Sequence, residues 1–211
     1  MDHNKETIAT WNKIAGLYEE KFMELDLYND TYDAFCAAVG KRKANILEIG
    51  CGPGNVSRYL IQQEPGWFIT ATDIAPNMIA LAQKNNPSAN CLVMDSREIG
   101  KLEVQFDGII GGFVLPYLSV EESRQLIADC NKLLNSKGIL YLSFVDGKPE
   151  DSGYQTGSSG DRIYFNFHQM KTILQELERN NFELIHLFNK EYKRTGGLSE
   201  THIIIIARRN E

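Results

Sequence analysis

The sequence predicts an α/β fold in which a doubly wound, seven-stranded, mostly parallel sheet ends in a C-terminal antiparallel hairpin, with N-terminal helices as cover. Three observations predict it. Short apolar segments alternate with helical patterns five times, which favours parallel strands because only a crossover helix joins parallel neighbours. These segments are apolar almost throughout, so both faces of the sheet are expected to be covered. Two longer β-rich segments then close the chain.

The parallel strands are expected in residues 45–50 (NILEIG), 67–73 (WFITATD), 91–95 (CLVMD), 106–112 (FDGIIGG) and 138–145 (GILYLSFV). Short apolar runs that are bounded by turn residues are typical of buried strands. The two final segments, 182–192 and 201–209, are separated by a short glycine-containing link and therefore favour an antiparallel hairpin.

Helical spacing of apolar residues is found in residues 7–22, 28–39, 55–63, 76–85, 119–134 and 168–181. Pro76 suits the first turn of its helix. Ser119, with Glu122 three residues later, has the pattern of a capping box. The asparagines at 180–181 tolerate the left-handed conformation that often closes a helix.

The 211 residues are enough for one domain with a full core, and no linker divides them. We expect a helical cover (1–43), a core that binds the ligand (44–145), and a last helix with the hairpin (166–211). Between them, residues 146–165 are rich in Gly and Ser and are not expected to form a packed element. Because this segment also carries aromatic side chains, it is interpreted either as a mobile lid or as an ordinary surface loop.

Composition and charge exclude several function classes. The net charge of −6 and pI near 5.3 argue against nucleic acid as a partner, because phosphate contacts need a basic face. The four cysteines have no C-x-x-C spacing, which argues against a metal site or a disulfide framework and favours a cytoplasmic location. No apolar run is long enough to span a membrane, and the N-terminus does not resemble a signal peptide. The oligomeric state is left open.

Three alternate glycines, Gly50, Gly52 and Gly54, follow the first predicted strand and precede a helix. Glycine lets backbone approach a ligand closely, and a helix N-terminus offers free N–H groups. The dinucleotide fingerprint G-x-G-x-x-G would need a third glycine at position 55, where Asn55 stands. The pattern E-x-G-x-G-x-G, with Glu48 before the glycines, instead suits a ligand with a carboxylate and an amino group. We call residues 50–54 the glycine corner.

Three acids, Glu48, Asp73 and Asp95, are expected at the carboxyl ends of three successive strands, where open α/β sheets bind ligands. An acid at position 73 can accept hydrogen bonds from both ribose hydroxyls. Asp95 could accept one from an adenine amine. Together they would repel a phosphate-bearing cofactor and attract a cationic one.

Five motifs together resemble those of class I S-adenosylmethionine-dependent methyltransferases: "ILEIGCGPG", "ATDIAPNMIALA", "CLVMDS", "FDGIIGGFVLPYL" and "LLNSKGILYLSF". The segment "WNKIAGLYEEKF" is similar to the helix that precedes the core in the branch acting on small molecules. The resemblance covers residues 8–145 closely and 165–207 as a last helix and hairpin. It departs from the family at Gly111 and Gly112, where a small polar residue and Asn are common.

The resemblance implies a cofactor site. Its implied residues are Tyr18, Glu48, Gly50, Cys51, Gly52, Gly54, Asp73, Ile74, Met78, Asp95, Ser96, Gly111, Gly112 and Phe113. By this resemblance the glycine corner packs on the amino-acid part with Glu48 near its amine, and Asp73 holds the ribose. Ile74 and Met78 cover the adenine, and Asp95 with the Ser96 backbone addresses its edge. Gly111, Gly112 and Phe113 border the methyl group, and Tyr18 folds over the cofactor.

The sequence is therefore interpreted as a methyltransferase that uses S-adenosyl-L-methionine and a small-molecule acceptor. If a base is needed, His168, Tyr18, Tyr117 and Tyr164 are the candidates, whereas His202 carries no signal of its own. Two alternatives stay open. One is a nicotinamide-dependent oxidoreductase. The other is a non-catalytic module that binds the cofactor and acts through a protein partner.

Overall fold

A computed structural model describes residues 3–157, 160–193 and 199–211. Its helices are α1 (His3–Phe22), α2 (Asn29–Val39), α3 (Asn55–Gln63), α4 (Pro76–Asn85), α5 (Val120–Leu133) and α6 (Met170–Arg179). Three short 3₁₀ turns are η1 (Ser96–Lys101), η2 (Leu115–Tyr117) and η3 (Pro149–Asp151). The local signals explain several boundaries. Pro76 occupies the first turn of α4, and the reciprocal capping box of Ser119 and Glu122 opens α5.

The main sheet contains β1 (Asn45–Ile49), β2 (Phe68–Asp73), β3 (Asn90–Val93), β4 (Phe106–Gly111), β5 (Leu134–Val145), β8 (Phe182–Lys193) and β9 (Ser199–Arg209). Their spatial order is β3-β2-β1-β4-β5-β9-β8. The first five strands are parallel to one another, and β9 is antiparallel to both β5 and β8. The predicted seven-stranded, mostly parallel sheet with a terminal hairpin is confirmed.

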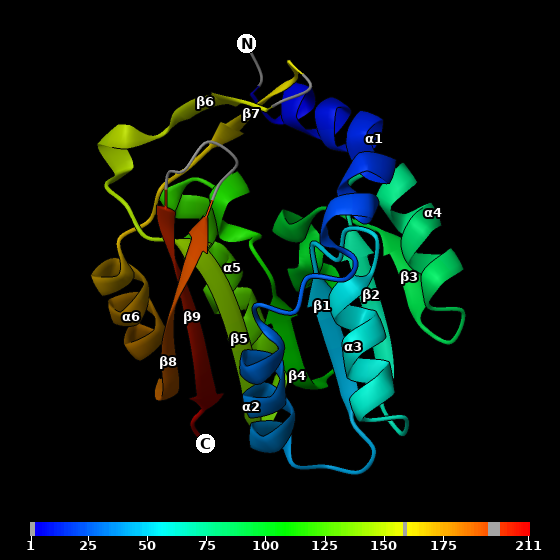
Figure 1. The fold of residues 1–211 in the computed structure, drawn as a ribbon. Helices are drawn as coiled ribbons and strands as arrows, with labels where there is room; N and C mark the ends of the chain where they lie inside the picture. Colours follow the sequence, from blue (N-terminus) through cyan, green and yellow to red (C-terminus); the bar gives the residue numbers. More distant parts are fainter. Residues whose placement is uncertain (1–2, 158–159, 194–198) are drawn as a thin grey trace.

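Helices cover both faces of this sheet, as Figure 1 shows. One core cluster joins α2 and α3 to the sheet through fully buried residues such as Phe35, Ile46 and Leu60. The other core cluster joins α5 and α6 to the opposite face through residues such as Leu126 and Ile173. The long N-terminal helix α1 lies beyond the carboxyl ends of the parallel strands (Figure 1). Strand order reverses between β1 and β4, which places the ligand crevice of such a sheet beside the end of β1.

The segment 146–165 differs from its prediction. It contains η3 and a two-stranded antiparallel sheet of β6 (Gly153–Thr156) and β7 (Arg162–Phe165), so the expectation of no packed element is wrong; Ser158 and Ser159 lie outside the described residues. In Figure 1 this hairpin reaches across to α1. The Thr10 hydroxyl donates to the Arg162 carbonyl at 3.0 Å, and the Tyr164 amide donates to the Thr7 hydroxyl at 3.1 Å. Contact with α1 gives the hairpin the support that its own residues lack.

Candidate active site

The glycine corner turns the chain from β1 into α3 by means of three left-handed residues. The φ angles of Gly50, Gly52 and Gly54 are +69°, +52° and +85°. An L side chain rarely adopts such angles, because its Cβ would approach the following carbonyl oxygen. The corner therefore exposes bare backbone where the crevice of the sheet opens.

Gly54 has a packing role besides its conformational one. A Cβ at this position would collide with the side-chain amide of Asn86 and lie 3.2 Å from the Ala82 Cα. The Asn86 amide donates to the Gly54 carbonyl at 2.9 Å and to the Ala82 carbonyl at 3.2 Å. Gly54 thus holds α3 against α4.

Asp73, at the end of β2, ties the glycine corner to the start of α4. One carboxylate oxygen accepts from the Gly52 amide and the other from the Ala75 amide, both at 2.9 Å. Burial raises the pKa of Asp73, and the backbone amides of Ala75, Gly52 and Ile74 oppose that rise. Each oxygen retains a lone pair for a further donor, so a ribose could bind here without displacing the corner.

Glu48 is only 2% exposed and accepts a hydrogen bond from the Ser57 hydroxyl of α3. Burial raises its pKa to about 8, although the hydrogen bonds from Ser57 act in the opposite direction. In the absence of a cationic partner, most of this carboxyl is protonated at pH 7. The expectation of a standing negative charge at position 48 therefore needs correction.

Asp95 is also not a free acid. Its side chain caps η1 by accepting from the Arg97 amide at 2.9 Å, and it accepts from the Arg97 guanidinium Nε at 2.9 and 3.0 Å. Burial acts to raise the pKa of Asp95, but the hydrogen bonds and charge of Arg97 outweigh it and keep the pKa below its usual value. Attraction of a cation by three free acids is thus not what the structure shows, since Arg97 neutralises one and burial protonates another.

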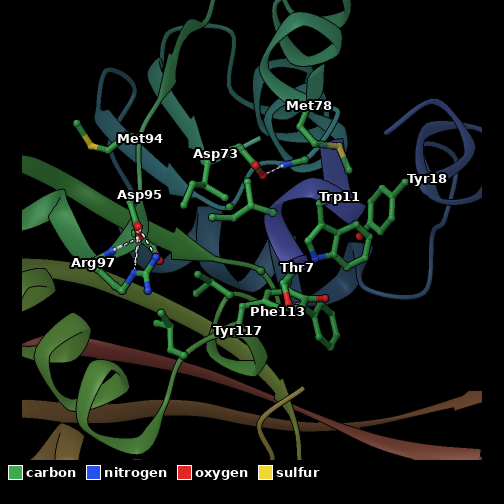
Figure 2. Close-up of a pocket in the computed structure, with 18 residues that line it drawn as sticks. Thr7, Trp11, Tyr18, Asp73, Met78, Met94, Asp95, Arg97, Phe113 and Tyr117 are labelled. Atoms are coloured by element: carbon green, nitrogen blue, oxygen red, sulfur yellow. Dashed lines mark hydrogen bonds and ion pairs between the residues drawn. The ribbon is translucent and has the colours of Figure 1, made fainter. Parts of the chain in front are cut away.

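These residues surround a cavity that we call the strand-end pocket. Its lining includes Thr7, Trp11, Tyr18, Gly50, Gly52, Asp73, Ile74, Met78, Asp95, Ser96, Arg97, Gly112, Phe113 and Tyr117. In Figure 2, Asp73 and the Asp95–Arg97 pair lie across the pocket from Trp11 and Tyr18 of α1. The pocket therefore combines an apolar wall from α1 with polar groups from strand ends.

Trp11 of α1 packs edge to face on two tyrosine rings. Trp11 stacks in this way on Tyr18 and Tyr117, with ring centroids 5.4 and 5.5 Å apart. Burial raises the pKa of Tyr18 to about 12, so its hydroxyl stays protonated. Within the described residues, the buried indole Nε1 of Trp11 has no hydrogen-bond partner. A buried donor of this kind is costly unless a ligand accepts from it.

A second cavity of about 590 Å³ adjoins the first, and we call it the hairpin pocket. Residues of both pockets form the boundary between them: Trp11, Tyr18, Gly50, Gly52, Gly112, Phe113 and Tyr117. Beyond this boundary the hairpin pocket reaches Glu48, Cys51 and Asn55 on one side and Gln155, Ile163 and Phe165 of the β6–β7 hairpin on the other. Phe113 is strained in a left-handed conformation (φ +55°), and its amide donates to the Ser143 hydroxyl at 3.0 Å.

Of the residues predicted to bind the cofactor, Gly54 and Gly111 line neither pocket. Gly54 is packed on α4, as described above. A Cβ at Gly111 would lie 3.0 Å from Val114 and 3.1 Å from Leu142, so this glycine serves close packing. The other implied cofactor residues line at least one pocket.

Two of the candidate bases are also placed away from both pockets. His168 is 3% exposed, and its Nε2 lies 2.9 Å from the Leu115 carbonyl and 3.1 Å from that of Leu118. It must donate to these carbonyls, so it holds η2 and cannot take a proton from a ligand there. Burial lowers its pKa, against the two carbonyl bonds. Tyr164 packs its ring on Tyr154 of the hairpin at 5.3 Å.

The sequence reasoning missed His202, which lines the hairpin pocket with Tyr28, Tyr192 and Glu200. A signal was present. In an antiparallel partner of the fifth parallel strand, the N-terminal residues lie at the ligand-binding edge, and His202 pairs with Val145 at the end of β5. Among the described residues, no group of His, Cys, Asp and Glu has an arrangement that could hold a metal ion, and no helix is long and apolar enough to cross a membrane.

Solved structures share this architecture over nearly the whole chain. Magnesium protoporphyrin IX methyltransferase from Synechocystis PCC 6803 with bound SAM has a TM-score of 0.71 at 19% identity, covering 100% of this chain and 98% of that one. A Burkholderia thailandensis 1,6-didemethyltoxoflavin-N1-methyltransferase, with bound 1,6-didemethyltoxoflavin and S-adenosylhomocysteine, has a TM-score of 0.73 at 17% identity, with coverages of 98% and 88%. Residues 46–138 match the family model of a methyltransferase domain.

Residues 46–138 are thus similar to a methyltransferase domain, and the chain has the fold of solved methyltransferases. The chain is also similar in sequence to the malonyl-[acyl-carrier protein] O-methyltransferase of Enterobacter lignolyticus, at 26% identity over 145 residues. That match covers 67% of this chain and 55% of the relative, so the chain spans about half the length of that protein. The region that matches the family model includes the glycine corner and the ends of β2 and β3, where the polar groups of the strand-end pocket lie.

Proposed function

We propose that this chain binds S-adenosyl-L-methionine and transfers its methyl group to a small-molecule acceptor. The observation that carries the proposal is the pair of adjoining pockets, which meet at the glycine corner and Phe113. A methyl donor in one pocket and an acceptor in the other would bring the reacting atoms together at that boundary. Alignment of two bound reactants in this way is a large source of rate acceleration.

The residues of the strand-end pocket fit the nucleoside part of the cofactor. Asp73 has lone pairs left for ribose hydroxyls, while Ile74 and Met78 supply apolar surface for a base. Because Arg97 occupies the Asp95 carboxylate, we assign recognition of the adenine edge first to the Ser96 backbone. Asp95 contributes there only if an oxygen can be shared with Arg97.

The boundary fits the amino-acid part. The N-cap residue of α3, Gly54, makes no side-chain cap, so the leading N–H groups of the helix, apart from the Ser57 amide that bonds to Glu48, can meet a carboxylate. The bare backbone of Gly50 and Gly52 allows close approach. The unpartnered Trp11 indole can donate to the same ligand. Glu48 would become ionised when a cationic amine binds beside it. When bound, the cofactor supplies an electrophilic methyl group; the chain orients the reactants and excludes water.

We assign the acceptor to the hairpin pocket, whose volume of about 590 Å³ suits a small molecule. The net charge of −6 supports a small molecule over a nucleic acid. The four free cysteines support a cytoplasmic location. The β6–β7 hairpin closes one side of this pocket, so we retain the proposal that it acts as a lid.

Calorimetry and a product screen test the proposal. S-adenosylhomocysteine should bind the purified protein and NAD should not; the reverse result would favour the nicotinamide oxidoreductase. A screen with a labelled methyl donor against small molecules, protein and tRNA should label a small molecule. Binding without transfer to any acceptor would favour the non-catalytic module, and labelled tRNA would overturn the acceptor class.

A further inference from the structure

A histidine and a glutamate of β9 meet a tyrosine from a distant part of the chain in the hairpin pocket. His202, near the start of β9, is 6% exposed, and its Nδ1 lies 2.6 Å from the hydroxyl of Tyr28. Its Nε2 lies 3.7 Å from a carboxylate oxygen of Glu200. The imidazole plane lies within 16° of the planes of the Tyr28 and Tyr192 rings, at centroid distances of 6.1 and 5.1 Å.

These distances fit one resting arrangement of protons. Burial keeps the pKa of Tyr28 far above its usual value, so the phenol retains its proton and donates it to Nδ1 of His202. A neutral imidazole that accepts at Nδ1 carries its own proton at Nε2. The Glu200 carboxylate, 3.7 Å from Nε2, would stabilise the imidazolium after a proton arrives. The order glutamate, histidine, hydroxyl is that of a proton relay.

The relay lies in the hairpin pocket, in contact with the boundary residue Phe113. The ring of Phe113, which lines both pockets, packs edge to face on the His202 imidazole at 4.7 Å and lies 5.5 Å from the Tyr28 ring. Phe113 keeps its strained backbone conformation at this point. An acceptor atom beside Phe113 would thus be near both the donor pocket and the Tyr28 hydroxyl.

We propose that Tyr28, His202 and Glu200 form the proton relay for methylation of a hydroxylated aromatic acceptor; this inference rests on the proposed function. As the acceptor oxygen forms its bond to the methyl group, the bond from that methyl to sulfur breaks. The O–H bond of the acceptor also breaks, and its proton passes to the Tyr28 oxygen. Tyr28 passes its own proton to His202 Nδ1, and Glu200 stabilises the imidazolium. The products are the methyl ether, S-adenosylhomocysteine and one proton, held by His202 until solvent removes it.

The chemistry of the pocket wall selects the acceptor class. Its aromatic side chains include Trp11, Tyr28, Phe113, Tyr117, Phe165 and Tyr192. Such a wall suits a flat aromatic ring. A relay that ends in a neutral histidine is useful only for an acceptor that must lose a proton, and a phenolic hydroxyl meets both conditions.

The test compares two phenols that differ in acidity. With the wild-type protein and a labelled methyl donor, both 4-methylphenol and 4-nitrophenol should be methylated. His202→Gln should lower kcat for 4-methylphenol by about 100-fold or more, the usual scale of general-base catalysis. It should change kcat for 4-nitrophenol, which ionises without help, by much less. Tyr28→Phe and Glu200→Gln should follow the same pattern. The exposed His186 of neighbouring β8 supplies the matched control, His186→Gln, which should leave kcat for both phenols unchanged.

A binding measurement tests the proton relay without turnover. In the complex with S-adenosylhomocysteine near pH 6, bound 4-nitrophenol should absorb as the phenolate in wild type and as the phenol in His202→Gln. Equal ionisation in both proteins, or equal loss of rate with both phenols, would overturn the relay; no binding of either phenol would overturn the acceptor class. If His202→Gln does not fold, Tyr28→Phe carries the same test. Failure of wild type to bind S-adenosylhomocysteine would instead refute the proposed function.

Discussion

At the scale of single residues, Glu48 shows how burial changes the role of a charged group. The side chain is enclosed between β1 and α3 and shares the proton of the Ser57 hydroxyl rather than pairing with a cation of the protein. Desolvation favours the neutral acid, and a cationic amine that bound beside Glu48 would convert it to an ion pair. The free energy that burial of this carboxyl costs is therefore offset only when a cationic ligand binds.

The raised pKa of Glu48 predicts the pH dependence of stability. Since the folded pKa of about 8 exceeds the unfolded value of 4.5, the contribution of Glu48 is complete below about pH 4.5 and is lost as pH rises through about 8. Glu48→Gln removes this dependence. Tm measured without ligand at pH 5, 7 and 9 should show the variant gaining on wild type as pH rises. A constant difference between the two proteins across this range would contradict the raised pKa.

Asp73 is the second residue with a testable role. Asp73→Ala should weaken S-adenosylhomocysteine binding at least tenfold, because hydrogen bonds to a carboxylate contribute roughly 1.5–3 kcal/mol each. The variant also leaves the Gly52 and Ala75 amides without their acceptor, so Tm must be measured beside the calorimetric Kd. The control is Asp33→Ala on α2, which removes a carboxylate that accepts from the Tyr59 hydroxyl of α3. Unchanged affinity in a folded Asp73→Ala protein would remove the ribose role.

At the scale of elements, the join between β1 and α3 divides structural from ligand-facing glycines. Gly54 caps α3 and is packed against α4, whereas a Cβ on Gly52 would meet only the Tyr18 ring at 3.6 Å. Both have positive φ, so the two positions share conformational strain and differ in their surroundings. A matched pair of alanine variants can therefore separate packing from ligand approach.

Gly54→Ala should lower Tm markedly, because it adds the collision with Asn86 and Ala82 to a left-handed strain of roughly 1–2 kcal/mol. Gly52→Ala should lower Tm only by the amount that the left-handed strain causes. It should also weaken S-adenosylhomocysteine binding by more than this loss of stability explains. Thermal melting and calorimetry on both variants check this. Similar Tm values for the two variants would show that Asn86 yields easily and that Gly54 has no special packing role.

At the scale of the whole molecule, α1 connects parts that are far apart in the sequence. Its aromatic residues line both pockets, its Asn12 side chain accepts from the Asn77 amide of α4 at 2.8 Å, and its threonines hold the β6–β7 hairpin. The Lys13–Asp161 ion pair at 2.8 Å adds to the hairpin contact. A ligand that orders α1 from one pocket should therefore also reduce the mobility of the residues around the other pocket.

Hydrogen exchange tests this connection. S-adenosylhomocysteine alone should raise protection in the glycine corner, in α1 and also in β7, since β7 bonds to α1 through Thr7 and Thr10. The double variant Thr7→Val and Thr10→Val removes both hydroxyls at buried positions and should abolish the effect in β7 while leaving that in the corner. Thr172→Val on α6 is the control. Full protection of β7 in the double variant would mean that the hairpin closes independently of α1.

The sequence by itself determined the features that depend on near neighbours. Alternating apolar segments and helical patterns predict the parallel sheet; Pro76, and Ser119 with Glu122, predict helix starts; glycine spacing predicts the corner. At the end of α6 it is Asn181 that adopts the left-handed conformation, with φ +61°. In each case the physical cause acts over a few residues, through a fixed φ, a local hydrogen bond or a repeat of apolar side chains.

Only the tertiary structure decided the features that depend on distant partners. Tyr28 and His202 are 174 residues apart and meet because β9 inserts between β5 and β8. The β6–β7 hairpin packs on α1 through Thr7 and Thr10, and burial beside α3 raises the pKa of Glu48. A short separation in the sequence is not enough to predict a contact either. Asp95 and Arg97 are two residues apart, but their pairing depends on the turn that η1 makes. Burial and charge pairing are set by the surroundings of a side chain, and those surroundings exist only when the chain has folded.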